Sequence, residues 1–385
     1  MDARCERAMT EALDDSRRLR VLVLTNHLKG FGGSEIVALE IASGLAGLGD
    51  EVTLAANVID APLVDHATGL NLTDDIAGID LPAYDLVWCQ HDLLSLLPLS
   101  TFARSARDRL PHIVQASLSA FEPYEHLNGL LARALSADVY ANSAETADAV
   151  AAANSGILKR GDIHVFHNAA PAPFWRRADA TRHPTQLGSV LLVSNHPPEE
   201  IDGCAAALAA RGVLVRRLGT GHEVRLFEPD DLISADAVVS IGKTVSYAIA
   251  MGKPAFIYDH FGGDGWLTSD NFEHNRHFNF SGRPQLRRYD SETLAVKILQ
   301  GYAEATADSA KFADKFDLSR FHLEHHLHTL RERAFKRASA SHRMQRRMKL
   351  SSLLVQPFFR AHLESSRRKA EVARYLRRHI EGSHD

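Results

Sequence analysis

The sequence is poor in cysteine and has no long hydrophobic run. Its 385 residues include three cysteines, Cys5, Cys89 and Cys204, which lie far apart. An odd number of scattered cysteines argues against a disulfide framework or a cysteine zinc site and favours a reducing compartment. No apolar stretch reaches the length of about 18 residues that a transmembrane helix needs. The N-terminal stretch MDARCERAMTEALDDSRRLR has no apolar core and carries acids, which is not typical of a signal peptide. We therefore expect a cytoplasmic protein.

Negative charge is scarce in the C-terminal segment. Residues 331–385 hold 15 Lys and Arg but 5 Asp and Glu, a surplus of +10, so the remainder of this −4 chain carries −14. Such asymmetry predicts either a solvated basic helix or a segment that meets an anionic partner. The stretch RMQRRMKLSSLLVQPFFRAHL (343–363) mixes arginines with apolar side chains, so it is a candidate for packing across the first half of the chain or for contact with an anionic membrane surface. Few aromatics interleave with the basic residues, and no nucleic-acid partner is expected.

A complete P-loop is missing, although its last residues are present. Gly242-Lys243-Thr244 matches the end of that motif, but Ala237 occupies the position of its first glycine. The backbone cradle that a P-loop kinase needs is therefore absent. What remains is a strand, a Gly-Lys-Thr turn and a helix that starts near Thr244. Such a helix start directs backbone donors and a lysine at an anion, so we expect these three residues to bind a phosphate.

Strand and helix patterns alternate along most of the chain. LRVLVLTNH (19–27) is typical of a strand buried on both faces, and it precedes a glycine-rich turn and a helix that we expect Ser34 to cap. The same alternation resumes after the Pro-rich, charged stretch 169–186. The pattern predicts an α/β protein with two Rossmann-like doubly wound domains and a helical C-terminal extension. The expected divisions are a flexible N-terminus (1–16), a first domain (17–178), a second domain (179–305) and a basic helical segment (306–385). The cleft between the domains is the expected ligand site.

Several of these segments together resemble the GT-B glycosyltransferases, close to the retaining nucleotide-sugar enzymes of family four. VLVLTNHLKGFGGSEIVALEIASGLAGLGDEVTLAA, which contains Gly32-Gly33-Ser34-Glu35, resembles the first strand, loop and helix of that family. YDLVWCQHD resembles a strand that ends in histidine, ADVYANSAET a strand–helix corner, and IHVFHNAA the strand that closes the first domain. ADAVVSIGKTVSYAIAMGKPAFIYD resembles the donor half. The resemblance covers residues 19 to 260.

The sequence departs from this family in the residues that hold the donor. An Arg and a Lys that usually follow the first strand of the second domain are replaced by Ser194-Asn195-His196-Pro197-Pro198. The positions of two donor glutamates fall at Tyr247 and near Val239 or Ser240, and a first-domain histidine is replaced near Ser117. We expect Lys243 to supply the missing positive charge.

The resemblance implies transfer of a sugar, with retention, from a nucleotide-diphosphate sugar to a polysaccharide, lipid-linked or small-molecule acceptor. Its motifs make His91 the expected catalytic residue and give Glu35 and Asn168 an acceptor-binding or structural role. The glycine-rich, aromatic and polar stretch 258–283 has the composition of a ligand-facing loop. The expected donor-binding residues are Gly32, Gly33, Asn195, Gly242, Lys243, Thr244, Asp259, His260, Gly262 and Gly263. A nucleotide-sugar epimerase and a non-catalytic partner subunit, which the missing donor residues would explain, stay open as alternatives.

The stretch FHLEHHLH (321–328) has the spacing of a metal site. His322 and His325 or His326 share a helix face, as two metal ligands can. No third ligand is evident in the sequence, and GT-B chemistry resembles a metal-independent type. We therefore expect neither a metal nor a cofactor.

Overall fold

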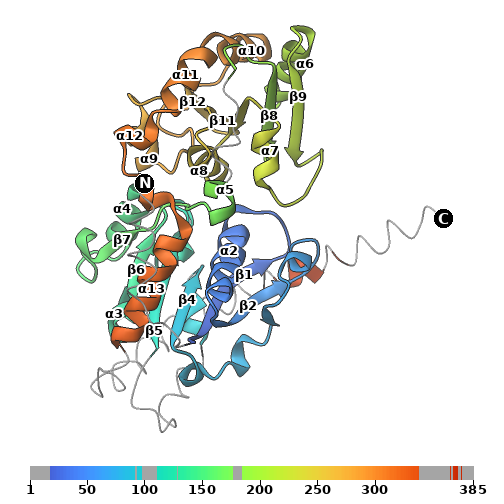
Figure 1. Cartoon of the computed structure of the whole chain (residues 1–385). Helices are drawn as coiled ribbons and strands as arrows, with labels where there is room; N and C mark the ends of the chain where they lie inside the picture. The colour runs from blue at the N-terminus through green and yellow to red at the C-terminus, as the bar shows by residue number, and fades with distance from the viewer. Residues whose placement is uncertain are drawn as a thin grey trace, which may run out of the picture.

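Two α/β lobes form the molecule, one above the other in Figure 1. The computed structural model describes residues 18–91, 93–97, 111–127, 129–176 and 184–337, together with 365, 367–371 and 374. The N-terminal residues 1–16 and the basic stretch 343–363 lie outside the described residues.

The first lobe is built on a 7-stranded parallel sheet of order β3-β2-β1-β4-β5-β6-β7. Its main elements are β1 (Arg20–Leu28), α2 (Gly33–Gly47), β2 (Glu51–Ile59), β3 (Asn71–Thr73), β4 (Leu86–Gln90), β5 (His112–Ser117), α3 (Gly129–Leu135), β6 (Asp138–Ala141), α4 (Ala144–Ala153) and β7 (Ile163–Val165). Short 3-10 turns join them, of which η6 (Pro123–His126) concerns the site.

The second lobe is built on a 5-stranded sheet of order β12-β11-β10-β8-β9, in which β12 alone is antiparallel to its neighbour. Its elements are β8 (Ser189–Ser194), α6 (Glu200–Ala210), β9 (Leu214–Gly219), α7 (Pro229–Ile233), β10 (Ala237–Ser240), α8 (Lys243–Ala250), β11 (Ala255–Asp259), β12 (Gly262–Trp266), α9 (Phe272–His277), α10 (Ser291–Gln300), α11 (Tyr302–Ser309) and α12 (Phe312–Lys315). The predicted pair of Rossmann-like doubly wound domains is therefore confirmed.

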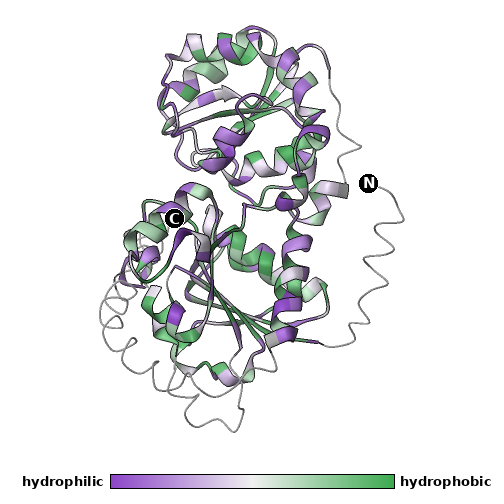
Figure 2. Ribbon diagram, turned by 90° about the vertical axis from the view of Figure 1, so that its left-hand side faces the viewer, coloured by the Kyte–Doolittle hydropathy of each residue, from purple (hydrophilic) through white to green (hydrophobic). Residues whose placement is uncertain are grey.

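Burial on both faces explains why the central strands read as continuous apolar runs. In β1, Val21 and Val23 pack into the core under α2, whereas Leu22 and Leu24 pack into the core on the opposite face. Successive side chains of a strand point to opposite faces, so both sets must be apolar when helices cover both faces. Figure 2 shows the resulting concentration of hydrophobic residues on α2 and on the strands inside each lobe.

The last long helix, α13 (Leu323–Arg337), returns from the second domain to the first. Leu323, Leu327 and Leu330 join the core under α2, and Arg331 Nε pairs with the buried Asp50 carboxylate at 3.0 Å. Farther on, Arg367 donates to the carbonyl oxygens of Asn57 and Asp74, so this part of the basic segment packs on the first domain.

The chain changes domain near Ala170 and again near His322. Ala170 N–H donates to the Phe321 carbonyl at 2.7 Å, and Leu323 N–H donates to the Ala170 carbonyl at 3.0 Å, so the two crossings run side by side. Helix α5 (Ala172–Arg176), before the expected boundary at 178/179, already packs with the second domain through Phe174. The expected boundary at 305/306 falls inside α11, because Tyr302 and Ala305 belong to the second domain's core.

Candidate active site

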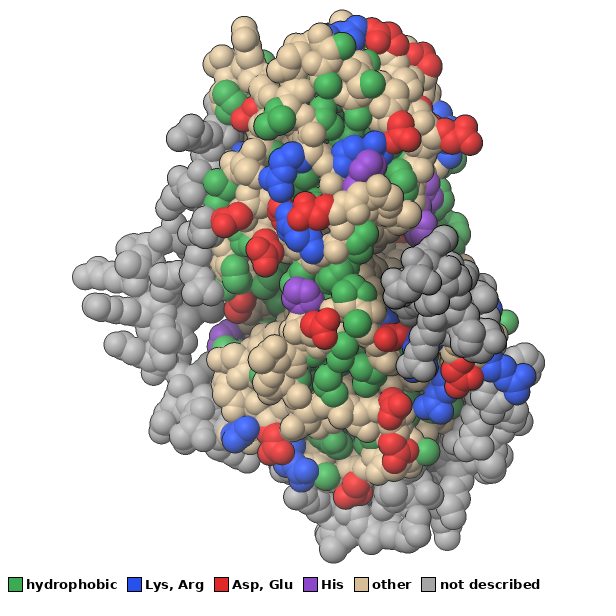
Figure 3. Space-filling model, turned by 90° about the vertical axis from the view of Figure 1, so that its right-hand side faces the viewer, with side chains coloured by type: hydrophobic (Ala, Val, Ile, Leu, Met, Phe, Trp, Pro, Cys, Tyr) green, Lys and Arg blue, Asp and Glu red, His purple; other side chains and the backbone are tan. Residues whose placement is uncertain are grey.

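A cavity of about 760 Å³ lies between the domains, at the carboxyl ends of their strands. It is lined by ten of the predicted site residues: Gly32, Gly33, His91, Asn168, Asn195, Gly242, Lys243, Thr244, Asp259 and His260. In the space-filling view, histidine side chains lie along the border of the two lobes among charges of both signs (Figure 3). Glu35, Gly262 and Gly263 are not among the lining residues.

The glycine loop of the first domain presents the start of α2 to the cavity. The helix begins at Gly33 with Gly32 as N-cap, so the predicted cap at Ser34 is wrong by two positions. Glu35 folds back over the loop, and its carboxylate accepts the N–H groups of Lys29, Gly30 and Gly32 at 3.0–3.2 Å. A Cβ on Gly32 would lie 2.6 Å from that carboxylate, which explains the glycine. Glu35 therefore holds the glycine loop in its conformation and is not part of the cavity lining.

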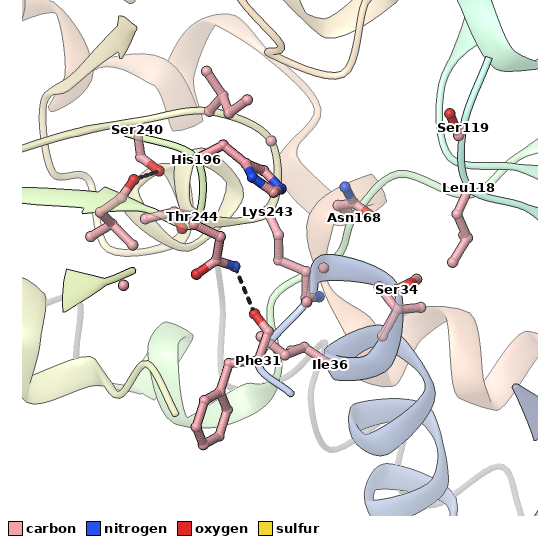
Figure 4. A pocket seen from close by; sticks show the side chains of 18 of the residues that line it. Phe31, Ser34, Ile36, Leu118, Ser119, Asn168, His196, Ser240, Lys243 and Thr244 are labelled. Atoms are coloured by element: carbon pink, nitrogen blue, oxygen red, sulfur yellow. Dashed lines mark hydrogen bonds between the residues drawn. The ribbon is translucent and has the colours of Figure 1, made fainter. Parts of the chain in front are cut away.

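The second helix start faces the same cavity from the other domain. Gly242 has φ 60° and ψ −123°, a conformation that favours glycine, and α8 begins at the next residue. The first N–H groups of an α-helix have no partner inside the helix, so both α2 and α8 offer donors here. Figure 4 shows Lys243 and Thr244 of α8 on one side of this space and Ser34 and Ile36 of α2 on the other.

Lys243, which we expect to bind a phosphate, contacts a carboxylate of the first domain. Lys243 Nζ lies 2.5 Å from Glu40 Oε2, and it donates to the Ala169 carbonyl at 2.7 Å. Tyr247, at the position of an expected donor glutamate, donates its hydroxyl to the same carboxylate at 2.5 Å. Burial raises the pKa of Glu40, and the ammonium beside it opposes that rise. Lys243 thus ties α8 to α2 across the domain boundary.

Polar side chains of the second domain gather where β8 and β11 end. Ser194 donates to Asp259 Oδ1 at 2.6 Å, and His260 Nδ1 lies 3.7 Å from the other carboxylate oxygen. Burial raises the pKa of Asp259. His196 and His260 meet edge to face at 5.5 Å. Asn195 donates its side-chain amide to the Phe31 carbonyl of the glycine loop at 3.0 Å, which links the domains directly (Figure 4).

Few positive side chains remain for an anion. Among the described residues, Arg225 and Lys243 are the Lys and Arg side chains that line the cavity. Arg225 pairs with Glu223 and Asp231, as Lys243 pairs with Glu40. Backbone N–H groups and the histidines are therefore the main groups available to an anionic ligand.

The first-domain side of the cavity holds a buried carboxylate that the sequence did not reveal. Glu125, in η6, is 6% exposed, and its Oε2 accepts the N–H groups of Leu118 and Ser119 at 2.7 and 3.1 Å. Its Oε1 lies 3.7 Å from His91 Nε2. Burial raises the pKa of Glu125 to about 7. Residues 117–130 carry no recognisable motif, and only the fold brings Glu125 beside His91.

His91 is held in one orientation at the end of β4. Its φ of 59° is left-handed, which turns the chain sharply away from the strand. Asn26 N–H donates to His91 Nδ1 at 3.2 Å. Because Nδ1 accepts this bond, the neutral ring carries its proton on Nε2, the nitrogen that faces Glu125.

Two predicted donor glycines serve the sheet. The region of Gly262 and Gly263 was expected to be a ligand-facing loop, but Gly262–Trp266 forms β12. Gly263 N–H donates to the Arg287 carbonyl at 2.9 Å, so this amide is already used. Added Cβ atoms would lie 2.3 Å from Arg287 O at Gly262 and 1.8 Å from Ile257 O at Gly263. These glycines permit close backbone packing.

Asn168 is a domain-bridging residue that also lines the cavity. Its side-chain amide donates to Asn279 Oδ1 of the second domain at 3.0 Å.

The histidines of 321–328 lie apart from the cavity lining, and His326 Nε2 contacts the Arg320 carbonyl at 2.8 Å. Within the described ranges, no group of three or more His, Cys, Asp or Glu side chains could hold a metal ion. None of the helices in those ranges is long and apolar enough to cross a membrane.

Comparison with known proteins gives matches among solved structures alone. No protein-family model and no curated protein matches this chain. It is similar to a glycosyltransferase from Rickettsia africae ESF-5, with 14% identity and a TM-score of 0.45 over 83% of this chain and 99% of the other. It is similar to WaaG, a glycosyltransferase involved in lipopolysaccharide biosynthesis, with 12% identity and a TM-score of 0.44 over 83% and 100%. A third match is LpCGTa in complex with UDP, with 16% identity and a TM-score of 0.43 over 89% and 100%.

Proposed function

We propose that this chain is a glycosyltransferase that moves a sugar from a nucleotide-diphosphate sugar to an acceptor hydroxyl. One observation carries the proposal: α2 and α8 begin at the same cavity, one from each domain. Transfer breaks the bond between the anomeric carbon and a diphosphate, so negative charge builds on the leaving phosphate. Helix N-termini in a closed cleft stabilise such charge.

The cavity divides into a donor side and an acceptor side. Asn195, His196, Asp259 and His260 lie on the second-domain side, where the carboxylate suits ribose hydroxyls and the imidazoles suit phosphate oxygens. His91 and Glu125 lie on the first-domain side, where an acceptor would approach the anomeric carbon. In this arrangement the histidines bind the phosphate oxygens, in place of the missing Arg and Lys.

The acceptor and the stereochemistry are predictions from the resemblance. It predicts a polysaccharide, lipid-linked or small-molecule acceptor, and retention of the anomeric configuration. Retention depends on donor contacts that this chain does not reproduce. The anomeric coupling constant of the product therefore tests whether the configuration is retained. Scarce, scattered cysteines support a cytoplasmic location.

A non-catalytic partner subunit is the alternative. Tyr247 and Ser240 line the cavity where the resemblance places acidic donor contacts. Tyr247 is committed to Glu40, and Ser240 donates to the Val193 carbonyl at 2.8 Å. Such a subunit would release no nucleotide diphosphate from any donor.

A panel of nucleotide sugars, followed by thermal stabilisation and nucleotide diphosphate release with and without acceptors, tests the proposal. Release that depends on acceptor supports transfer, sugar interconversion indicates an epimerase, and absence of binding indicates a partner subunit. The variant Gly33→Ala probes the helix start, because a Cβ there meets nothing within 4 Å and the fold should hold. We expect donor affinity to fall about 10-fold, the value of one weakened charged hydrogen bond. Gly47→Ala, equally open and at the far end of α2, is the matched control and should bind normally.

A further inference from the structure

His91 and Glu125 form a pair of side chains on the first-domain side of the cavity. Ser117 Oγ donates to the Glu125 carbonyl at 2.8 Å and fixes η6 against the end of β5. Two backbone N–H groups hold Oε2, which leaves Oε1 turned toward His91. Both side chains line the cavity into which α2 and α8 open.

The distance between the two side chains suits an oxygen that contacts both. The separation of 3.7 Å from His91 Nε2 to Glu125 Oε1 exceeds a direct hydrogen bond. A hydroxyl oxygen at about 2.8 Å from each atom would accept from Nε2–H and donate to Oε1. The backbone N–H on Nδ1 fixes the imidazole tautomer that this arrangement requires.

The surroundings of Glu125 make its carboxylate a base that works near neutral pH. Burial is the main cause of its raised pKa, and the charge of Glu122 in the same loop adds to it. The N–H groups of Leu118 and Ser119 lower the pKa of Glu125. His91, directly after β4, faces the Glu125 carboxylate. A general base is most effective when its pKa lies near the working pH.

We propose that Glu125 is the general base that takes the proton of the acceptor hydroxyl, with His91 as the group that orients that oxygen. Glu125 Oε1 gains the proton as the acceptor O–H bond breaks. The oxygen then forms its bond to the anomeric carbon, and the bond from that carbon to the phosphate breaks. The electron pair leaves with the nucleotide diphosphate, toward the starts of α2 and α8. A base on the acceptor oxygen implies direct displacement, so the product has the inverted anomeric configuration.

This inference rests on the proposed glycosyl transfer and opposes the retention that the resemblance predicts. Asp259, the other cavity carboxylate with a raised pKa, belongs to the second domain and already binds Ser194. Glu122 is exposed. Glu125 is therefore the buried carboxylate on the first-domain side of the described lining, beside an imidazole that a backbone N–H holds in place.

The test compares Glu125→Gln with wild type, using the donor and acceptor that the nucleotide-sugar panel identifies. Gln keeps a side-chain oxygen for Leu118 and Ser119, so the loop should hold. We expect kcat to fall roughly 100-fold or more, while the thermal shift given by UDP or GDP stays unchanged. Wild-type kcat/KM should rise with pH through about 7, because the base must lose its proton, and the variant should lose this inflection. Glu304→Gln, an exposed change on α11, is the control and should behave as wild type.

Transfer to azide distinguishes a general base from a residue that only supports the structure. Azide carries no proton, so its attack on the anomeric carbon needs no base. We expect Glu125→Gln to match wild type in glycosyl azide formation. Equal transfer to hydroxyl acceptors by variant and wild type, loss of azide transfer in the variant, or a product with retained configuration would each overturn the inference. A wild-type protein that transfers nothing to any acceptor overturns the proposed function itself.

Discussion

Replacement of Lys243 by methionine tests whether this lysine holds the domains together or binds the donor. The ammonium is 9% exposed and the Glu40 carboxylate 14% exposed, so the variant leaves a carboxylate in a nearly dry environment. Removal of one partner of a buried ion pair costs about 3–5 kcal/mol. For domains of this size, each kcal/mol lowers Tm by about 2–4 °C. We therefore expect a fall of roughly 6–20 °C in a thermal scan, against little change for the exposed control Lys311→Met.

The pH dependence of this variant follows from the same carboxylate. Burial already raises the pKa of Glu40, and loss of Lys243 removes the group that opposes the rise. A carboxyl with a raised folded-state pKa favours folding at low pH and loses that contribution as pH rises through the folded pKa. The Tm deficit of Lys243→Met should therefore be smaller at pH 5 than at pH 8, and Glu40→Gln in the same chain should recover part of it. A variant that melts with wild type and binds UDP or GDP far more weakly would refute the reasoning, because Lys243 would then act on the ligand.

Three further predictions follow from packing, burial and charge. Leu327→Ala, in the contact of α13 with α2, should lower the free energy of unfolding by about 2–5 kcal/mol in a denaturant titration, whereas the exposed Leu214→Ala should change it little. Glu125 has a folded-state pKa raised to about 7, so its contribution to stability is present below pH 4.5 and lost as pH rises through 7. Glu125→Gln does not titrate, so its free energy of unfolding relative to wild type should rise by about 2.5 kcal/mol between pH 5 and pH 8 in denaturant titrations. For the basic C-terminal segment, flotation with anionic vesicles distinguishes packing from membrane contact: membrane contact predicts that the full chain floats and that a chain ending near residue 337 does not, whereas packing on the first domain predicts that neither floats.

The central strands of both sheets could be predicted from the sequence, and most of the predicted site residues line the cavity. Continuous apolar runs such as 19–27 identify strands buried on both faces, and residues at the carboxyl ends of parallel strands must share one edge. Gly32, Gly242 and Asp259 could therefore be assigned to one cavity without a structure. The same logic placed His91 there.

Long-range pairings could not be read in the same way. Glu40 sits in the middle of a helix, 207 residues from Tyr247, and no local pattern marks it as the partner of Lys243. Glu125 lies in a short turn whose sequence carries no motif, and its burial depends on the ends of β4 and β5. At Gly262 and Gly263, glycine signals close backbone approach, and composition cannot tell whether a ligand or another strand approaches.

The paired crossings at Ala170 and Phe321 constrain how the cleft can open. Within the described residues, the two domains are joined by two adjacent chain segments, tied to each other by backbone hydrogen bonds. A single connection would let one domain swivel freely, whereas two side by side leave rotation about one axis as the easy motion. The starts of α2 and α8 would then move apart by rotation about the paired crossings and return to the same alignment when the cleft closes.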